Sequence, residues 1–386
     1  MAVFALFLLI SPVLFNSSVM LKGETEEVGF TIKMSVTYHN NGKKNWIFTE
    51  EERAIGLFMN NSWQTIQLMN HSYPLENTTF DEDGNPVTLL QFPKTELKPG
   101  ENISYTVRYY ALSKPRLLPN LREEDSGTLS DIPEELKESY CEGDLWLVDD
   151  PELRNVAQNI AENETKVLVI VKKFVEWIRQ NIGYSAHEVP SYPNETYTEG
   201  SGDCDDQAIL FVTLCRIYEI PSYLQVGCMY MSTEGVKETY WEGHLTTSLE
   251  HIGWHGWAIV NIPPWGWLPV DLTWWRYNAL DAIEKAAVTS QTTLQYMNIS
   301  QIDYIASSRM YRDFLKNNGF YVYTQDEMME ASPSNHGNDT FEKLFPQILI
   351  IATVVVAVFA AGISVYIWER GKPKEIESNN SLTSTA

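Results

Sequence analysis

Basic residues are scarce in this sequence of 386 residues, which has 28 lysines and arginines against 51 aspartates and glutamates. The formal net charge of −23 is the opposite of the basic surface that the phosphates of a nucleic acid require. We therefore expect no nucleic-acid partner. So much charge of one sign favours a soluble surface through repulsion between molecules.

Cysteine is rare as well, with only Cys141, Cys204, Cys215 and Cys228, which is too few for a disulfide scaffold. Cys204 and Cys215 lie eleven residues apart on one predicted helix, about 16 Å, too far for a bridge. The sequence allows one disulfide bridge between two of the residues Cys141, Cys215 and Cys228, and it does not decide which two. The Cys-x-x-Cys spacing of zinc sites and the acidic loop of calcium sites are absent, so we expect no metal and no cofactor.

Long apolar runs are limited to two segments. Residues 2–15 are too short to span a bilayer and are similar to the apolar part of a secretory signal, although no lysine or arginine precedes Lys22. Residues 348–368 are uncharged and long enough to cross a bilayer as a helix. A buried core helix is the alternative for this second run.

The flanks of residues 348–368 predict its orientation. Arg370, Lys372 and Lys374 follow the run, so the positive-inside rule places the tail in the cytoplasm and the preceding chain outside the cell. This basic flank also disfavours a core helix. Asn-x-Ser/Thr sequons before the run favour a glycosylated exterior. They occur at Asn60, Asn70, Asn77, Asn102, Asn163, Asn194, Asn298 and Asn338.

Residues 26–113 contain short apolar runs separated by turn residues. Ile103, Tyr105, Val107 and Tyr109 alternate with polar residues, which is typical of a half-buried strand. Turn pairs stand at Asn41-Gly42, Asp83-Gly84 and Pro99-Gly100. This pattern predicts an all-β sandwich of immunoglobulin-like character, and we find no catalytic cluster in it.

Helical and strand patterns are mixed after residue 150. Apolar residues spaced as in a helix occupy 167–182, and a second such pattern runs from Asp203 to the break at Pro221. Residues 257–275 read as two strands around a turn at 263–266. A capping box from Ser300 to Asp303 and a stop at Gly319 predict a further helix.

Cys204 lies at the predicted start of the second helix, in the stretch EGSGDCDDQAIL. Free amides and the helix dipole at such a start lower the pKa of a thiol. Asp205 and Asp206 favour a helix start, and at about 100° per residue their side chains should diverge from the thiol. We therefore expect these acids to begin the helix without opposing the sulfur.

A nucleophilic thiol also needs a base and a group that orients the base. His255 and Asp271 lie on the two arms of the predicted hairpin, approximately opposite each other, so a hydrogen bond between them is geometrically natural. If the hairpin packs against the helix start, Cys204, His255 and Asp271 form a triad.

Other interpretations of these residues remain. His244 and His251 are alternative bases that the hairpin geometry disfavours, and His187 is expected in a loop. Zinc held by Asp203, Cys204 and His255 is a further alternative, although the usual ligand spacing is absent. Free cysteine is often buried and structural, which is the simplest alternative for Cys204.

Three stretches occur in the order GSGDCDDQAILFVTLCRIYEIPSYLQVG, HGWAIV and GWLPVDLT, with FVEWIRQNIGYS upstream. Together, over residues 165–275, they resemble the transglutaminase-like superfamily. The motif Gly-Asp-Cys-Asp-Asp is more similar to its microbial and archaeal branch than to the animal cross-linking enzymes. The resemblance implies an α+β, papain-like core with Cys204 as nucleophile, His255 as base and acid, and Asp271 as its orienter. Family members also bind an oxyanion through the nucleophile's amide and a second donor. Tyr184 is our candidate donor, with a buried structural tyrosine as the alternative.

The resemblance and the membrane signals together imply a single-pass, membrane-anchored enzyme with an extracellular catalytic domain. A protease or amide hydrolase acting on protein or peptide substrates is the first expectation. A cross-linking transamidase and a non-catalytic binding or structural glycoprotein are the alternatives. The predicted parts are a signal sequence (1–18), a β-sandwich (19–115), a transglutaminase-like domain with leading strap and trailing helix (116–330), a stalk (331–347), a transmembrane helix (348–368) and a cytoplasmic tail (369–386).

Overall fold

The computed structural model describes residues 27–233, 235–274 and 278–331. All of them belong to one unit, residues 1–333. The predicted signal sequence, transmembrane helix and tail, nearly all of the stalk, and Asn338 fall outside the described residues. Within the described ranges, no helix has the length and apolar character needed to cross a membrane.

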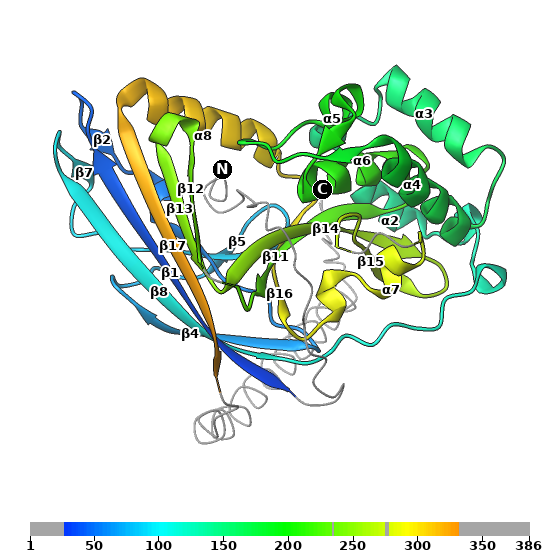
Figure 1. The fold of residues 1–386 in the computed structure, drawn as a ribbon, viewed down its shortest axis with the longest axis horizontal. Helices are drawn as coiled ribbons and strands as arrows, with labels where there is room; N and C mark the ends of the chain where they lie inside the picture. Colours follow the sequence, from blue (N-terminus) through cyan, green and yellow to red (C-terminus); the bar gives the residue numbers. More distant parts are fainter. Residues whose placement is uncertain (1–26, 234, 275–277, 332–386) are drawn as a thin grey trace, which may run out of the picture. The chain divides into compact units, whose positions relative to one another are not determined.

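A six-stranded sheet dominates one part of this unit, in the order β12-β13-β17-β1-β8-β4 (Figure 1). Neighbouring strands are antiparallel except β13 and β17, which are parallel. Apolar residues alternate along β8, and Ile103, Tyr105, Val107 and Tyr109 are buried as predicted. The strands are β1 (Val28–Asn40), β4 (Gln64–His71), β8 (Asn102–Ser113), β12 (Val236–Tyr240), β13 (Leu245–Glu250) and β17 (Phe320–Ala331).

The immunoglobulin-like sandwich predicted for the N-terminal part is not confirmed. β17 pairs with β1 along its whole length, from Gly29 opposite Ala331 to Asn40 opposite Phe320. β12 and β13 also join this sheet, although they come from the segment predicted to lie in the second domain. The large sheet is therefore built from both halves of the described chain, which local strand patterns cannot reveal because the pairing is non-local.

Smaller strands cover the apolar face of the large sheet. Trp46 packs edge-on against Tyr38 with ring centroids 5.3 Å apart, and Phe58 does the same against Tyr109 at 5.2 Å. Asn41-Gly42 does not close a hairpin, because β2 pairs with β7 instead of β1. The small elements are β2 (Trp46–Ile47), α1 (Glu50–Arg53), β3 (Ala54–Gly56), β5 (Thr79–Phe80), β6 (Pro86–Leu89) and β7 (Glu96–Leu97).

A second sheet, of order β15-β14-β11-β16, packs against helices. Helix α6 contacts β14 and β11 on one side and α3, α4 and α5 on others, which explains why nearly all its side chains are buried. Every residue of β14 is buried too. The bounds are α3 (Pro151–Ala161), α4 (Val167–Asn181), α5 (Pro193–Glu199), α6 (Cys204–Ile217), β11 (Ser222–Tyr230), β14 (Ile252–Ile262), β15 (Gly266–Val270) and β16 (Thr293–Ile299).

Side-chain hydrogen bonds join the two sheets. The Gln64 amide donates to the Gln295 carbonyl at 2.8 Å, and the indole of Trp254 on β14 donates to Asp326 on β17 at 2.9 Å. Asp326 is fully buried, and this burial raises its pKa to about 7. Strand β14 is thereby connected to the large sheet.

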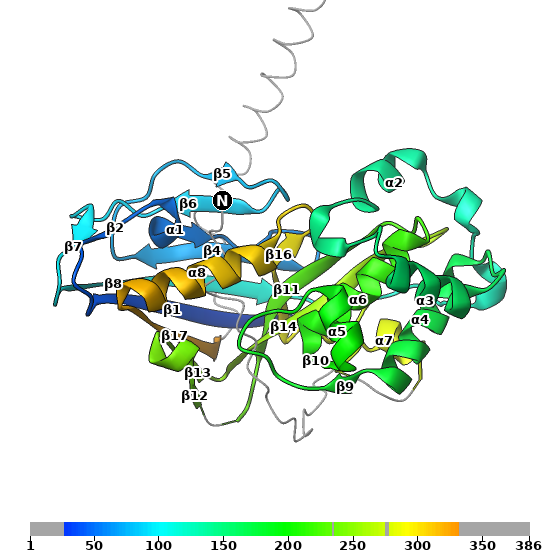
Figure 2. The same ribbon diagram turned by 90° about the horizontal axis from the view of Figure 1, so that it is seen from above.

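Helix α8 (Tyr304–Asn318) leads from the helical part back to β17 (Figures 1 and 2). Gly319 ends it with a positive φ of 69°, as predicted. Its N-cap is Asp303, which accepts from the Ala306 N–H at 2.9 Å, so the predicted capping box starting at Ser300 is wrong. Ser300 instead accepts from the guanidinium of Arg216.

The segment between the two sheets includes short helices and runs along the second sheet. The Gly127 N–H donates to the Pro263 carbonyl at 2.7 Å, and Arg116 donates to the Trp267 carbonyl at 3.3 Å. The remaining elements are η1 (Glu123–Asp125), η2 (Leu129–Asp131), α2 (Glu134–Tyr140), η3 (Asp144–Trp146), β9 (Gly183–Tyr184), β10 (Ser201–Gly202), η4 (Trp241–Gly243), α7 (Asp281–Glu284) and η5 (Ala287–Thr289).

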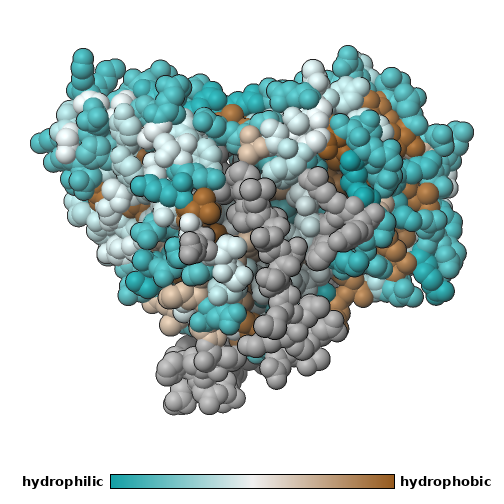
Figure 3. Space-filling model, in the orientation of Figure 1, coloured by the Kyte–Doolittle hydropathy of each residue, from teal (hydrophilic) through white to brown (hydrophobic). Residues whose placement is uncertain are grey.

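The surface and the cysteines agree with the composition. The face of the described chain in Figure 3 is mostly hydrophilic, with scattered apolar areas, as expected for an acidic chain. All four cysteines are buried and free, so the bridge left open among Cys141, Cys215 and Cys228 is not formed.

Candidate active site

Cys204 is the first residue of α6, as predicted, and Asp203 is the N-cap. The Asp206 carboxylate accepts from the Asp203 N–H at 3.2 Å, which fixes the start of the helix. Strand β10, which ends two residues before Cys204, pairs with β9. This pairing fixes the backbone that leads into Cys204. The Cys204 side chain is almost completely buried.

His255 and Asp271 form a buried pair, as predicted. His255 Nε2 lies 2.9 Å from Asp271 Oδ2, and the side chains are only 5% and 1% exposed. The last ladder pair of β14 and β15 is Ala258 with Val270, so Asp271 follows beside Trp257 and not directly opposite His255. The bond is therefore diagonal across the two strands, a distance that long side chains can span.

Backbone amides hold the Asp271 carboxylate in place. Oδ1 accepts from the N–H groups of Thr273 and Trp274 at 3.2 and 3.1 Å, and Oδ2 accepts from Ala287 at 3.0 Å. Burial alone would raise the pKa of Asp271, but the charge and hydrogen bond of His255 and these amides hold it below its usual range. An ionised Asp271 requires a proton on Nε2, which leaves Nδ1 of His255 as the nitrogen that accepts a proton from a thiol.

Close contact between β14 and α6 brings Cys204 to this pair. The N–H of Gly256, the residue after His255, lowers the pKa of the Cys204 thiol, against the larger opposite effect of burial. A Cβ on Gly256 would lie 3.1 Å from the Cβ of Asp205, so only glycine allows the strand this near to the helix. Trp257 and Trp274 flank the imidazole of His255, with ring centroids 5.8 and 6.3 Å away.

The expectation that the neighbouring acids would not oppose the sulfur of Cys204 is wrong. Burial raises the pKa of the thiol well above its usual value, and the charges of Asp203 and Asp205 raise it further. The polar side-chain atoms of Asp203, Cys204 and Asp205 all lie within 4.8 Å of one another. The argument that acids diverge at about 100° per residue fails for Asp205, whose carboxylate lies near the sulfur, and it did not include Asp203, which precedes the helix.

This Asp–Cys–Asp group does not fit a metal centre. Oxygens of the two carboxyl groups lie within 4.8 Å of each other, and Asp205 Oδ2 already accepts from the Tyr304 hydroxyl at 2.7 Å. His255, the third ligand of the zinc alternative, gives Nε2 to Asp271. We therefore assign no metal ion to these residues.

Tyr184 lies on β9 opposite Gly202, two residues before Cys204. Its side chain is 41% exposed, so the alternative of a buried structural tyrosine is wrong. Its role as an oxyanion donor stays a prediction. The alternative bases lie elsewhere: His244 stacks on Tyr321 beside the large sheet, and His251 Nδ1 lies 3.2 Å from the Met231 carbonyl oxygen.

The sequence interpretation missed a second His–Asp pair. His187 lies in a loop, as predicted, but its Nδ1 is 2.8 Å from Asp206 Oδ2, and its Nε2 is 3.6 Å from Glu199. The hydrogen bond with Asp206 raises the pKa of His187. The Asp206 carboxylate also accepts from the Ser191 N–H at 2.7 Å, so the pair ties this loop to the start of α6. No local pattern links residues nineteen positions apart in this way.

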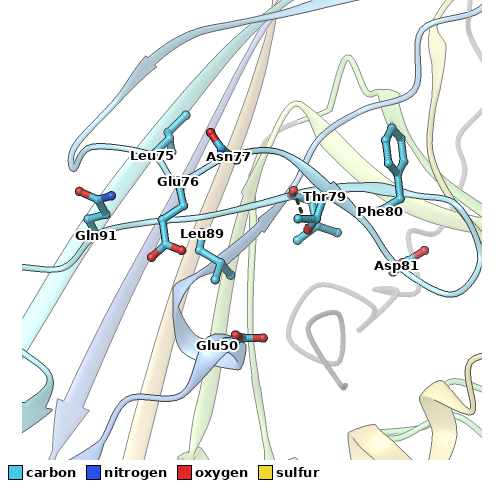
Figure 4. A pocket seen from close by; sticks show the side chains of 10 residues that line it. Glu50, Leu75, Glu76, Asn77, Thr79, Phe80, Asp81, Leu89 and Gln91 are labelled. Atoms are coloured by element: carbon cyan, nitrogen blue, oxygen red, sulfur yellow. Dashed lines mark hydrogen bonds between the residues drawn. The ribbon is translucent and has the colours of Figure 1, made fainter. Parts of the chain in front are cut away.

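A cavity of about 750 Å³ lies apart from these groups, beside β5, β6 and α1 (Figure 4). Leu75, Phe80 and Leu89 supply its apolar walls, and Glu50, Glu76 and Asp81 supply carboxylates. None of its lining residues belongs to the predicted triad.

Comparisons with known proteins agree with this site. The model of the transglutaminase-like superfamily matches residues 154–272, a segment that includes Cys204, His255 and Asp271. A search of the curated proteins finds no match. A protein of Cytophaga hutchinsonii, solved as a candidate cysteine protease, has a TM-score of 0.50 and 15% identity, covering 80% of this chain and 93% of its own.

Two other solved structures are more distant. The periplasmic domain of TgpA from Pseudomonas aeruginosa, bound to ethylmercury, has a TM-score of 0.32 and 14% identity, covering 67% of this chain and 93% of its own. A candidate protease of Parabacteroides distasonis has a TM-score of 0.21 and 10% identity, covering 61% and 65%. Residues 154–272 of this chain therefore match the core of the transglutaminase-like superfamily, and the fold is similar to that of the Cytophaga protein.

Proposed function

We propose that this protein is a cysteine amide hydrolase, most simply a protease, with Cys204 as nucleophile. The observation that carries the proposal is the buried His255–Asp271 pair, held 2.9 Å apart, with His255 directly before Gly256, whose N–H acts on the Cys204 thiol. A nucleophile, a base and an orienting carboxylate on three separate elements form the constellation that acyl transfer requires.

The first half of the reaction forms a thioester. His255 Nδ1 takes the proton of Cys204 as the sulfur attacks the amide carbonyl carbon, and the carbonyl becomes an oxyanion. The Cys204 N–H, the first amide of α6, has no partner within the helix and is suited to bind that oxyanion. His255 then gives its proton to the nitrogen of the leaving amine as the carbon–nitrogen bond breaks.

The second half regenerates the thiol. Water attacks the thioester carbonyl while His255 takes its proton, and the carbon–sulfur bond breaks to release a carboxylic acid and the thiol. Because burial and acids raise the pKa of Cys204, proton transfer to His255 accompanies attack and does not precede it. Asp271 keeps the imidazole in the required tautomer throughout.

Cross-linking is the second candidate, in which a primary amine replaces water at the thioester. Hydrolysis needs no acceptor beyond the solvent, and the likeness to candidate proteases favours it. A non-catalytic surface role is a third candidate, and the intact triad argues against it as the sole function.

We also propose that the catalytic part faces the outside of the cell, anchored by residues 348–368. The positions of the described sequons support this proposal. Side chains at Asn60, Asn70, Asn77, Asn102, Asn163 and Asn194 are all exposed. Asn298 is half-buried and accepts from the amide of Gln225 at 2.7 Å, so we expect it to carry no glycan.

Mass spectrometry of amide-bearing peptides, incubated with the protein with and without a primary amine, tests the reaction. We expect a new carboxylic acid in both samples and an amine adduct in a minor fraction. Cys204→Ala should abolish turnover, whereas Cys215→Ala, a buried cysteine on the same helix, should keep it. Turnover that survives Cys204→Ala would reject the mechanism.

A further inference from the structure

Asp203 and Asp205 place two carboxyl groups in the interior next to the nucleophile. They are only 4% and 2% exposed, and their oxygens lie within 4.8 Å of each other and of the Cys204 sulfur. In this region of the described chain, the ion pairs join His187 to Asp206 and His255 to Asp271, and none reaches Asp203 or Asp205. Two carboxylates without a cation in such a place cannot both keep their charge.

The two carboxyl groups have unequal surroundings. Asp205 Oδ2 accepts a 2.7 Å hydrogen bond from Tyr304, which stabilises a negative charge. Asp203 Oδ2 receives only a 3.4 Å contact from the His187 N–H, and its Oδ1 is buried without a partner. An oxygen that finds no donor in a dry site is satisfied once it carries a proton and donates it.

The electrostatics point the same way. Burial and then the charge of Asp205 raise the pKa of Asp203 well above its usual value. Burial also raises the pKa of Asp205, while its hydrogen bonds with Asp203 and Tyr304 oppose that rise. The proton therefore belongs on Asp203 and the charge on Asp205.

We propose that Asp203 and Asp205 share one proton at neutral pH, carried by Asp203 and donated to Asp205, and that they act on Cys204 as positioning residues. The proposal deepens the proposed function and rests on it only where it concerns turnover. With the proton in place, a single negative charge from this pair faces the sulfur. Without it, a second charge would oppose the thiolate at the same short distance.

The consequence is a nucleophile that stays a thiol in the free enzyme. Cys204 loses its proton only when His255 accepts it in the presence of a carbonyl carbon, so a stray electrophile meets an unreactive group. Other groups face this cluster from the neighbouring elements: His187 and Asp206, Tyr304 of α8, and Asp271 at the end of β15. They are unchanged in the variants below.

Infrared spectroscopy detects the shared proton directly. In Cys204→Ala at neutral pH we expect carbonyl stretching absorption of protonated carboxylic acids, to which Asp326 also contributes. The component that belongs to Asp203 should disappear when Asp203→Asn is added, and the component that belongs to Asp326 should remain. Absence of the Asp203 component at neutral pH would overturn the proposal. So would an Asp203 component that appears only after treatment with EDTA, since a metal ion would then have neutralised the pair.

The pH dependence of Cys204 alkylation by iodoacetamide tests the effect on the nucleophile. Asp203→Asn combined with Asp205→Asn removes the resident charge and leaves no second acid to ionise in its place, so it should speed labelling at pH 7 by about tenfold, which corresponds to a thiol pKa lowered by about one unit. Asp203→Asn keeps a donor towards Asp205 and should change labelling little at that pH. Glu199→Gln, an acid that contacts only His187, is the matched control and should have no effect.

Labelling that the double variant Asp203→Asn/Asp205→Asn leaves unchanged, or that Glu199→Gln accelerates equally, would contradict the proposal. Both measurements are made without any substrate. A protein that shows the Asp203 component and the alkylation shift but hydrolyses no amide would reject the proposed function and leave the shared proton standing. Amide hydrolysis without the Asp203 component would do the reverse.

Discussion

Two His–Asp pairs lie near the start of α6, and the distances between their partners are alike. His255 is 2.9 Å from Asp271, with side chains 5% and 1% exposed. His187 is 2.8 Å from Asp206, with side chains 22% and 0% exposed. Distance therefore does not tell the proposed catalytic pair from the other.

The two pairs differ in the imidazole nitrogen that does not contact the aspartate. His255 gives Nε2 to Asp271, and we propose that its Nδ1 serves the thiol of Cys204. His187 gives Nδ1 to Asp206, and its Nε2 faces the carboxylate of Glu199 at 3.6 Å. With acids at both nitrogens, His187 serves as a cation that holds a loop. A His–Asp pair is thus a base only where one nitrogen faces a reacting group.

Replacing each histidine in turn tests the difference between the two pairs with the largest expected effect. His255→Ala removes the base and should lower kcat/KM at least about a thousandfold. His187→Ala removes only a contact of the loop and should lower it by less than about tenfold. Steady-state kinetics on the peptide substrate measure both. Equal losses in two variants that remain folded would mean that the comparison is wrong.

Replacing each aspartate comes next in size. Asp271→Asn leaves the geometry but permits the wrong tautomer of His255, and kcat should fall by a factor of about a hundred to ten thousand. Asp206→Asn should mainly reduce the free energy of unfolding, by about 2 kcal/mol, since a buried charged acceptor of two backbone N–H groups is lost. Urea unfolding and kinetics on both variants separate the two effects. A more active Asp271→Asn than Asp206→Asn would contradict the assignment.

A methyl group at Gly256 probes the contact between strand and helix. Its Cβ would lie 3.1 Å from Asp205 Cβ and 3.4 Å from Asp205 Cα, so β14 must shift by a few tenths of an ångström. Because His255 is the preceding residue, we expect Gly256→Ala to lower kcat about tenfold with KM nearly unchanged. An increase in KM alone would show that the contact serves substrate binding and not the triad.

The smallest effect concerns stability and pH at His187. Its pKa is raised in the folded protein, so its contribution is fully present below about pH 6.5 and is lost as the pH rises through the folded value. His187→Gln should lower the free energy of unfolding at pH 6 by no more than about 1 kcal/mol, because the pair is partly exposed. The difference from the wild-type protein should shrink by pH 9 in urea titrations. A difference that grows with pH would reverse the sign and reject the cationic role.

Much of the triad was predictable because each part has a local signal. The helical spacing after Asp203 and the strand pattern around His255 fix the elements, and the hairpin brings Asp271 near without any knowledge of the rest of the fold. The alternation in β8 predicted its buried face for the same reason.

The remaining features depend on contacts that no local pattern encodes. Tyr304 reaches Asp205 across 99 positions of sequence, and Asp203 approaches Asp205 through side-chain directions that helix periodicity alone does not give. The place of β17 beside β1 is of the same kind, because strand residues specify a face but not a partner.

The pairing of β1 with β17 has a consequence for synthesis on the ribosome. One edge of β1 finds β8 early, but its other edge stays without a partner until residues 320–331 have been made. At typical elongation rates this wait lasts roughly a quarter of a minute to a minute. An open strand edge of that length is a template for misassociation, so the nascent chain should bind holdase chaperones until its last strand emerges.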